Sequence, residues 1–454
     1  MSGKQGTAVS DHMKYNVKPT AVRSENLLNN IKASNGNLFD GDNQHEIIFE
    51  IPAMAGGYYL DAAGSRIRFS LYLGEAAGRG TTDNEIFLDR GPCSLIETLT
   101  IHDASGHLLE SISNLDSLYS MIEMCTNTPD VRQYRSVFNG EGAFETVSDV
   151  QSINQFKGGR LYREAAALTT PFCPSDFTTY HKLEFVLPSG VFGQSCQKYY
   201  PLSAMNGFRI TLKLQQGIKA LYNSVDGATA HTYFISDPTL FLNLIRVDPE
   251  VDRGIIDGAK GPDEKIRIHT HSWRTYSKAI ATSDTSFEHV IPINVSSLKA
   301  IFFTFQETAA DTIRHYGSFY TRYLSSYQLF VDGAPIPASP VDTLPPYGEA
   351  VSELCRAWHV RHGDSDFPTC LTGGKVYRET DDNRESNMVY GIELESFSGK
   401  SNTIESGLNV LNSVLQMRGT FSDTADDAYT LRFYCMFDIF IVIDPETGVT
   451  TIEF

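Results

Sequence analysis

Two histidines in the second half of the chain are the residues best suited to hold a metal ion. His269 and His271 lie two positions apart in a segment that reads as a strand, so their side chains share a face and could bind one metal. No third ligand is evident nearby, and histidines at a surface or interface beside Trp273 are the simpler interpretation. His359 and His362 follow a predicted helix end, where the helix dipole and the last carbonyls account for a histidine. We therefore predict no metal site and no cofactor.

Two acidic runs carry the oxygen ligands that calcium prefers, residues 379–385 and 423–427. Neither run has the spacing of a calcium loop with its closing glutamate, so we interpret both as solvated loops. The single N-glycosylation acceptor, residues 294–296, lies between predicted strands and means little in a protein that is not secreted.

Glycine-containing segments do not form a nucleotide-binding loop. Gly399, Lys400 and Ser401 are similar to the end of a phosphate-binding loop, but that loop needs a glycine five residues earlier, where this chain has Leu394. Residues 140–142 lack a third glycine and a following helix. There is no G-x-S-x-G motif, and the spacing reveals no set of nucleophile, base and acid. We predict no catalytic residues and no enzyme, although a β-sandwich can assemble a site from distant loops.

The cysteines point to free thiols. None of the seven forms a C-x-x-C pair, and the odd count and irregular spacing argue against a zinc knuckle or a disulfide framework. Cys435 lies inside a predicted strand, where it packs as a small apolar residue. The others are Cys93, Cys125, Cys173, Cys196, Cys355 and Cys370.

The charge balance argues against general nucleic-acid binding. The chain has 55 acidic and 37 basic residues and a net charge of −18, which repels a phosphate backbone. Residues 1–44 are polar and nearly balanced in charge, so we expect a flexible N-terminal arm rather than a basic packaging tail. The N-terminus has no apolar signal-peptide core, and no stretch approaches eighteen apolar residues. We therefore expect a protein that is neither secreted by the usual route nor membrane-spanning.

An internal repeat decides the fold. Residues 233–249 and residues 429–445 are both long, aromatic and apolar, and both stop at an aliphatic residue followed by Asp-Pro. They are typical of the closing strands of two copies of one β-domain.

The segments between these two strands repeat in the same order. An Ile-Pro strand end closes residues 46–52 and residues 287–293, and a strand ending at a turn aspartate closes residues 95–103 and residues 327–333. In each half the hairpin leads into one short helix. The first is predicted from Asn114 to Met124, and the second carries Val351, Leu354, Cys355 and Trp358 at helical spacing.

These patterns predict an all-β protein of two tandem eight-stranded antiparallel jelly rolls, each with a short helix after a hairpin. The scarcity of helices between strands excludes a parallel βαβ architecture. We place the flexible arm at residues 1–44, the first jelly roll at 45–249, a linker at 250–262 and the second jelly roll at 263–454. The linker assignment rests on the segment of residues 248–262, which carries three glycines, two prolines and several charges.

Several sequence segments, taken in order, resemble those of the double jelly-roll major capsid proteins of eukaryotic double-stranded DNA viruses, in particular those of polinton-like viruses and virophages. These segments span nearly the whole chain from about residue 45. They are residues 51–69, residues 94–106 with the helix that follows, residues 187–208, residues 327–337 and residues 405–409.

The resemblance implies a major capsid protein that forms homotrimeric, pseudo-hexagonal capsomers of an icosahedral DNA virus shell. Its implied partners are further copies of itself, penton or vertex proteins and minor capsid proteins, with no sequence-specific nucleic-acid binding. Its implied location is the virion capsid, synthesised and assembled inside the host cell. Trimer formation and lateral packing are then expected to bury loop aromatics such as residues 319–320 and 199–200.

Two other functions fit a tandem β-sandwich. One is a receptor- or glycan-binding protein of a viral vertex or fibre, which predicts an exposed aromatic groove and affinity in a glycan array. The other is a two-domain enzyme, for example one acting on carbohydrates, which predicts a convergent pair of carboxylates in one cleft.

Overall fold

The computed structural model describes most of the chain, and the account that follows concerns that part. The described ranges are residues 24–74, 86–88, 91–126, 143–144, 156–157, 181–193, 195–196, 198–223, 232–308, 319–344, 348–358, 388–395, 407–424 and 428–454. The predicted candidates at residues 140–142, 379–385 and 399–401 lie outside these ranges, as do His359, His362, Cys173 and Cys370.

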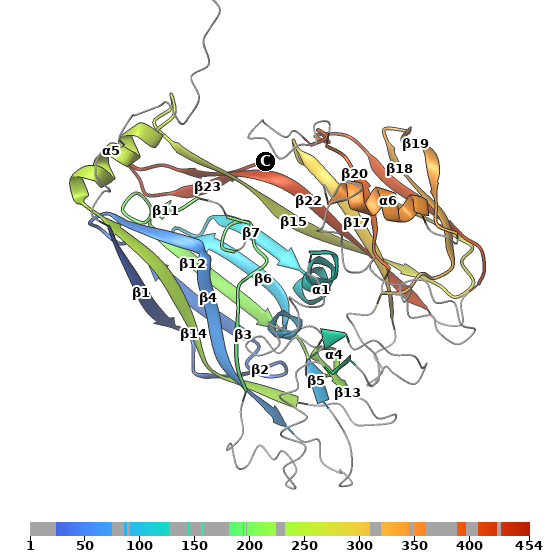
Figure 1. Cartoon of the computed structure of the whole chain (residues 1–454), viewed down its shortest axis with the longest axis horizontal. Helices are drawn as coiled ribbons and strands as arrows, with labels where there is room; N and C mark the ends of the chain where they lie inside the picture. Colours follow the sequence, from blue (N-terminus) through green and yellow to red (C-terminus); the bar gives the residue numbers. More distant parts are fainter. Residues whose placement is uncertain are drawn as a thin grey trace, which may run out of the picture.

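The first half of the chain forms two antiparallel sheets that enclose a core (Figure 1). One sheet has the order β1-β14-β4-β10, with β2 also paired to β14 and β11 to β4, and the other has the order β3-β12-β6-β7. The bounds of the first sheet are β1 Ser24–Lys32, β2 Leu38–Asp40, β4 Tyr58–Gly74, β10 His181–Phe185, β11 Tyr200–Pro201 and β14 Thr232–Val247. Those of the second are β3 Glu46–Pro52, β6 Ile96–Asp103, β7 Leu108–Ser113 and β12 Gly207–Leu214.

The second half repeats this arrangement. One sheet has the order β15-β22-β17-β20, with β23 also paired to β22, and the other has the order β16-β21-β18-β19. The bounds of the first of these are β15 Ile266–Ile280, β17 Leu298–Glu307, β20 Tyr390–Glu393, β22 Tyr429–Ile443 and β23 Thr450–Glu453. Those of the other are β16 Ser286–Ile291, β18 Leu324–Val331, β19 Ala334–Asp342 and β21 Leu415–Phe421.

Both halves share one strand order. If β1 and β2 are taken together as the first strand, each half pairs its strands as first–eighth–third–sixth in one sheet and second–seventh–fourth–fifth in the other. That is the antiparallel Greek-key order of a jelly roll. The structure therefore confirms the predicted all-β fold of two tandem jelly rolls.

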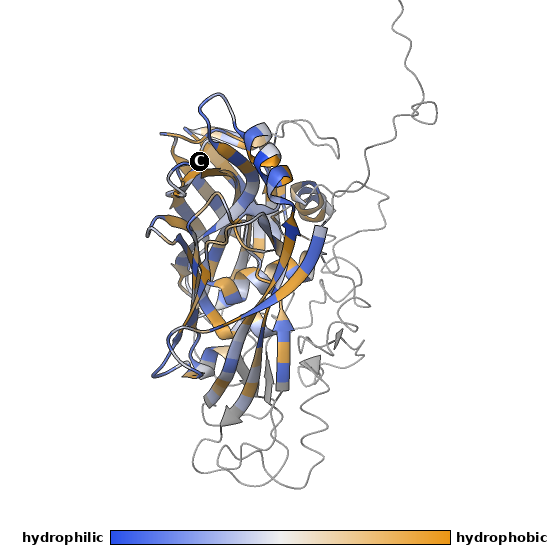
Figure 2. Cartoon of the chain, turned by 90° about the vertical axis from the view of Figure 1, so that its left-hand side faces the viewer, coloured by the Kyte–Doolittle hydropathy of each residue, from blue (hydrophilic) through white to orange (hydrophobic). Residues whose placement is uncertain are grey.

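Alternating burial explains why these segments form strands. Along β12, Phe208, Ile210 and Leu212 are buried, whereas Arg209 between them is exposed. The strands show the same mixture of apolar and polar residues when the molecule is viewed from the end where β1 lies (Figure 2). The central strand β22 is buried at nearly every position, which is typical of a strand covered on both faces.

Helices occupy a small part of the fold. The two predicted helices are confirmed as α1, Leu115–Thr126, and α6, Gly348–Ala357. Short elements complete the described chain: η2 Pro92–Leu95, α4 Gly217–Ala220, the pair β5 Ile86–Leu88 and β13 Leu221–Asn223, and the pair β8 Ala143–Phe144 and β9 Phe156–Lys157. No helix in the described part of the chain is long and apolar enough to span a membrane.

The predicted linker contains a helix. Helix α5, Pro249–Ala259, begins at Asp248, whose carboxylate accepts a hydrogen bond from the Glu250 amide at 3.1 Å. Asp248 is therefore an N-cap and Pro249 takes the first helical position, where a proline is well tolerated. The Asp-Pro pair that ends β14 starts this helix, and the glycines at 254 and 258 did not prevent it.

The predicted flexible arm is wrong for its described part. Residues 24–32 form β1, which pairs with β14 over nine residues from Ser24 with Val247 to Lys32 with Thr239. The first jelly roll therefore begins before residue 45. Sequence patterns did not reveal β1 because its residues are exposed on both faces, so it has no apolar alternation.

Candidate functional site: the seam between the two jelly rolls

The two predicted histidine candidates have separate partners. His269 Nε2 lies 3.1 Å from Asp438 Oδ1 and its side chain is half exposed, whereas His271 Nε2 lies 2.9 Å from Ser195 Oγ in the first jelly roll. Burial lowers the pKa of His271 to about 4, and the nearby Lys299 charge acts in the same direction. In the described ranges no three histidine, cysteine or acidic side chains gather in a group that could hold a metal.

A buried carboxylate joins the two halves of the chain. Glu110 of β7 is 4% exposed and accepts hydrogen bonds from the hydroxyls of Ser189 in the first jelly roll and Ser272 in β15 of the second. The backbone amide of Gly190 also donates to it, at 3.1 Å. Burial raises the pKa of Glu110, and the hydrogen bonds partly offset that effect. We call this contact between the halves the seam.

Close backbone approach holds the same region together. Thr270 Oγ1 donates to the Gly190 carbonyl at 3.0 Å. A Cβ atom built on Gly190 would lie 1.8 Å from the His271 carbonyl oxygen, so only glycine fits between the two jelly rolls at this point.

Further polar contacts join the two jelly rolls at both ends of the seam. Ser113 and Thr275 place their hydroxyl oxygens 2.8 Å apart, and Arg432 Nη1 donates to Ser117 Oγ of α1 at 2.7 Å. At the other end, the Asn206 amide donates to the Gly448 carbonyl at 2.8 Å, and the Thr450 amide donates to Asp103 at 2.9 Å.

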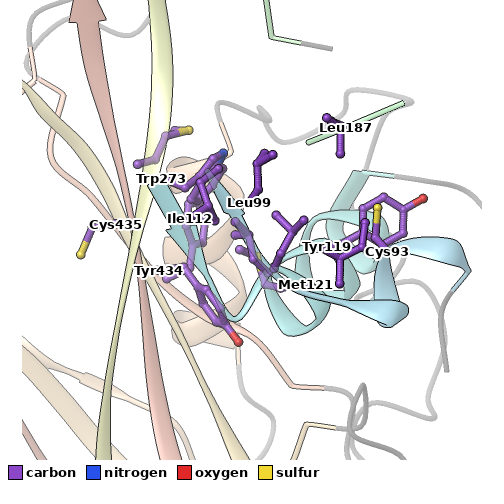
Figure 3. Close-up of a cluster of buried hydrophobic side chains, with 14 of the residues drawn as sticks. Cys93, Leu99, Ile112, Tyr119, Met121, Leu187, Trp273, Tyr434 and Cys435 are labelled. Carbon is purple, nitrogen blue, oxygen red and sulfur yellow. The ribbon is translucent and has the colours of Figure 1, made fainter. Parts of the chain in front are cut away.

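Apolar side chains also pack across the seam. Figure 3 shows Ile112 of β7 on the side of the first jelly roll that faces Trp273 of β15 and Tyr434 of β22. These residues belong to one hydrophobic cluster that includes the cores of both jelly rolls. Trp273 also packs against Phe302 and Trp358, with ring centroids 5.9 and 6.2 Å away. The two halves therefore share a core rather than meeting at a solvated surface.

A second buried charge cluster lies within the second jelly roll. Lys299 Nζ lies 2.8 Å from Glu395 Oε1 and 3.6 Å from Asp438 Oδ1. Burial alone would raise the pKa of Asp438, but hydrogen bonds from His269 and Ser297 and the Lys299 charge lower it. This cluster joins the start of β17 to β22 and to Glu395, which follows β20, and resembles a structural ion-pair network.

The remaining sequence candidates are structural. The described cysteines Cys93, Cys125, Cys196, Cys355 and Cys435 are buried thiols that form no disulfide within the described part of the chain. Asn294 accepts a hydrogen bond from the Asn412 amide at 3.2 Å. The expectation that residues 319–320 and 199–200 are exposed loop aromatics is wrong for three of the four. Phe319, Tyr320 and Tyr200 are 0–5% exposed within the single chain, because they pack into its core, and Tyr199 alone of the four is 52% exposed.

Sequence reasoning missed Glu110. The available signal was a glutamate between apolar residues in the strand Leu108–Ser113, since a charged side chain on a buried strand face requires partners from elsewhere. Its partners Ser189 and Ser272 lie 79 and 162 residues away, so no local pattern could identify them.

Comparison with known proteins identifies the fold. No protein-family model matches the chain, and no curated protein sequence matches it. Solved structures do match. The Faustovirus major capsid protein has a TM-score of 0.62 at 10% identity, covering 97% of this chain and 93% of that one. A chain of the Sputnik virophage structure has a TM-score of 0.59 at 11% identity, covering 98% and 92%. The mavirus major capsid protein has a TM-score of 0.50 at 12% identity, covering 100% and 96%.

These similarities extend over both jelly rolls and cover 92–96% of the three matched chains. At 10–12% identity they show a common fold. The chain therefore has the double jelly-roll fold found in viral major capsid proteins, as the sequence resemblance implied.

Proposed function

We propose that this chain is a major capsid protein that forms homotrimeric, pseudo-hexagonal capsomers of an icosahedral DNA virus shell. The observation that carries the proposal is the seam. Two complete jelly rolls of identical strand order are joined through a shared apolar core and the buried Glu110 network, which makes one rigid building block with two similar halves. Three such blocks in a ring present six similar units, which is the geometry that a hexagonal lattice requires.

Two further features support a structural role without enzymatic activity. The side chains of Glu110, Thr270 and Arg432 in the seam form hydrogen bonds within the chain, and these bonds hold the two halves together. The net charge of −18 disfavours direct contact with a genome, so neighbouring capsomers and other capsid proteins are the expected partners. The proposed location is the virion capsid, with assembly inside the host cell.

The mass of the purified protein in solution tests the proposal. Analytical ultracentrifugation across a range of concentrations is expected to show a species of three times 50.4 kDa, and negative-stain electron microscopy of that species is expected to show hexagonal particles. A monomer at every concentration, with no rings or shells, would contradict a capsomer. Binding of that monomer in a glycan array would instead favour a receptor-binding protein.

A further inference from the structure

The first strands of the two jelly rolls correspond residue by residue. Both eighth strands end at an aliphatic residue before Asp-Pro, Val247 in β14 and Ile443 in β22. Val247 pairs with Ser24 of β1, and Ile443 pairs with Ile266 of β15. Counting onward from these two pairs, Leu28 of β1 takes the position of Thr270 in β15, Asn30 that of Ser272 and Ala33 that of Thr275.

Equivalent positions in these strands differ sharply in exposure. Thr270 and Ser272 are 4% and 3% exposed, because β7 and the described residues 189–193 and 195–196 of the first jelly roll cover β15. Leu28 is 56% exposed and its neighbour Leu27 is 38% exposed. Leu28 is an exposed leucine at a position whose counterpart, Thr270, is buried, which indicates a surface that another molecule covers.

The strand that covers β15 also has a counterpart. β7 is the fifth strand of the first jelly roll and lies at the edge of its sheet, and β19 has the same place in the second. Most of β19 is exposed, whereas β7 has buried positions at Leu109, Glu110 and Ile112. β1 lies at one end of the molecule and β19 at the opposite end (Figure 1).

We propose that β19 of one copy covers β1 of the next, so that the contact between copies repeats the contact between β7 and β15 within a copy. The inference rests on the proposed capsomer and names the surface that builds it. The contact joins two different patches, so it is heterologous, and a ring forms when successive rotations close. Further exposed apolar side chains near β19, Leu344 at 46% and Val414 at 57%, extend the patch that a neighbouring copy would bury.

One test places a charge on the exposed leucine. Leu28→Asp puts a carboxylate where the equivalent Thr270 is buried, so it is expected to raise the concentration needed for half-assembly by about tenfold or more. Val290→Asp is the matched control. Val290 is 50% exposed on β16, and its counterpart Glu50 on β3 is exposed and takes no part in the seam contacts described above. The control is expected to assemble as the wild type does.

A second test captures the contact covalently. Ser113 of β7 and Thr275 of β15 face each other across the seam. The strand registers place Asp342 of β19 at the position equivalent to Ser113. They place Ala33, at the end of β1, at the position equivalent to Thr275. The double variant Ala33→Cys with Asp342→Cys is expected to form disulfide-linked dimers and trimers on oxidation, seen on a non-reducing gel. Each single variant is expected to stay monomeric there. The double variant Ser113→Cys with Thr275→Cys is expected to close a disulfide within one chain.

The outcomes separate this inference from the capsomer proposal. If the wild type forms trimers but Leu28→Asp assembles normally and the β1–β19 cysteines do not cross-link, the surface is wrong and the capsomer stands. If Leu28→Asp lowers the melting temperature without changing the assembled mass, residues 1–23 of the same chain cover β1 instead, and the inference is overturned. If the wild type is monomeric throughout, the capsomer proposal fails and this surface fails with it.

Discussion

The closing strands of the two jelly rolls, β14 and β22, hold the same place in the fold but differ in how continuously they pair with their neighbouring strands. β22 pairs with β15 over fifteen consecutive residues. β14 is interrupted at Asp237 and Pro238, where Asp237 has a φ of 55° and the register with β4 shifts. Its neighbour on the other side is accordingly divided into β1 and β2. Proline lacks the N–H that a continuous ladder needs, and an irregularity of this kind is the usual result.

This difference separates topology from burial. Both halves reach the same strand order, although one first strand is short, polar and exposed and the other is long and partly buried. The order follows from the alternation on the remaining strands, whereas burial of the first strand depends on whether a neighbouring jelly roll lies against it. The seam is therefore where the two halves cease to be equivalent, and the largest mutational effects are expected there.

Loss of the Glu110 carboxylate is expected to have the largest effect. Glu110→Ala leaves the Ser189 hydroxyl, the Ser272 hydroxyl and the Gly190 amide buried without their acceptor, which should lower the free energy of unfolding by about 3 kcal/mol. Urea denaturation measures the change. Glu97→Ala is the control, because Glu97 pairs with Lys213 at the surface and should contribute less than about 1 kcal/mol. Equal losses in the two variants would show that the seam is no more important than a surface ion pair.

A methyl group at Gly190 should have the next largest effect. Gly190→Ala places a carbon against the His271 backbone, which cannot move without parting the two jelly rolls, and should cost about 2 kcal/mol. Gly254→Ala provides the contrast. Its new carbon meets nothing within 4 Å in α5, so the variant should gain up to about 1 kcal/mol of helix stability. Thermal unfolding of both proteins measures the difference, and a stable Gly190→Ala protein would mean that the halves do not approach as closely as described.

The smallest expected effect is a pH dependence from His271. Its pKa is about 4 in the folded chain, below the ordinary value of 6.5, so the unfolded chain binds more protons between these values. The stability that His271 contributes is full above about pH 6.5 and is lost as the pH falls toward 4. We expect a loss of about 1 kcal/mol over this pH range. His271→Gln should show a smaller fall in melting temperature than the wild type between pH 6.5 and 4. Identical pH profiles for the two proteins would show that His271 does not contribute to the pH dependence of stability.

Several parts of the fold were predictable because their patterns are local. The shared Asp-Pro ends of β14 and β22, the Ile-Pro ends near β3 and β16, and the hairpin-then-helix order around α1 and α6 all occupy equivalent places in the structure. β1 was missed because its sequence has no apolar face, and α5 because glycine and proline suggested a linker.

The seam could not be predicted from the sequence, for a different reason. Glu110, Gly190 and Ser272 acquire their roles only when three distant segments meet, and burial of Tyr320 likewise depends on its pairing with β17.

Helix α5 has a mechanical consequence for a shell. Its Asp252 is buried and accepts hydrogen bonds from the Tyr59 hydroxyl at 2.8 Å and from Ser203 at 3.1 Å, so the connection between the jelly rolls is anchored to the first of them. A connection anchored in this way is rigid and does not act as a hinge between the two jelly rolls. In a closed shell built from this protein, curvature would then have to be accommodated at the contacts between neighbouring copies, while the chain itself keeps its shape from flat facet to edge.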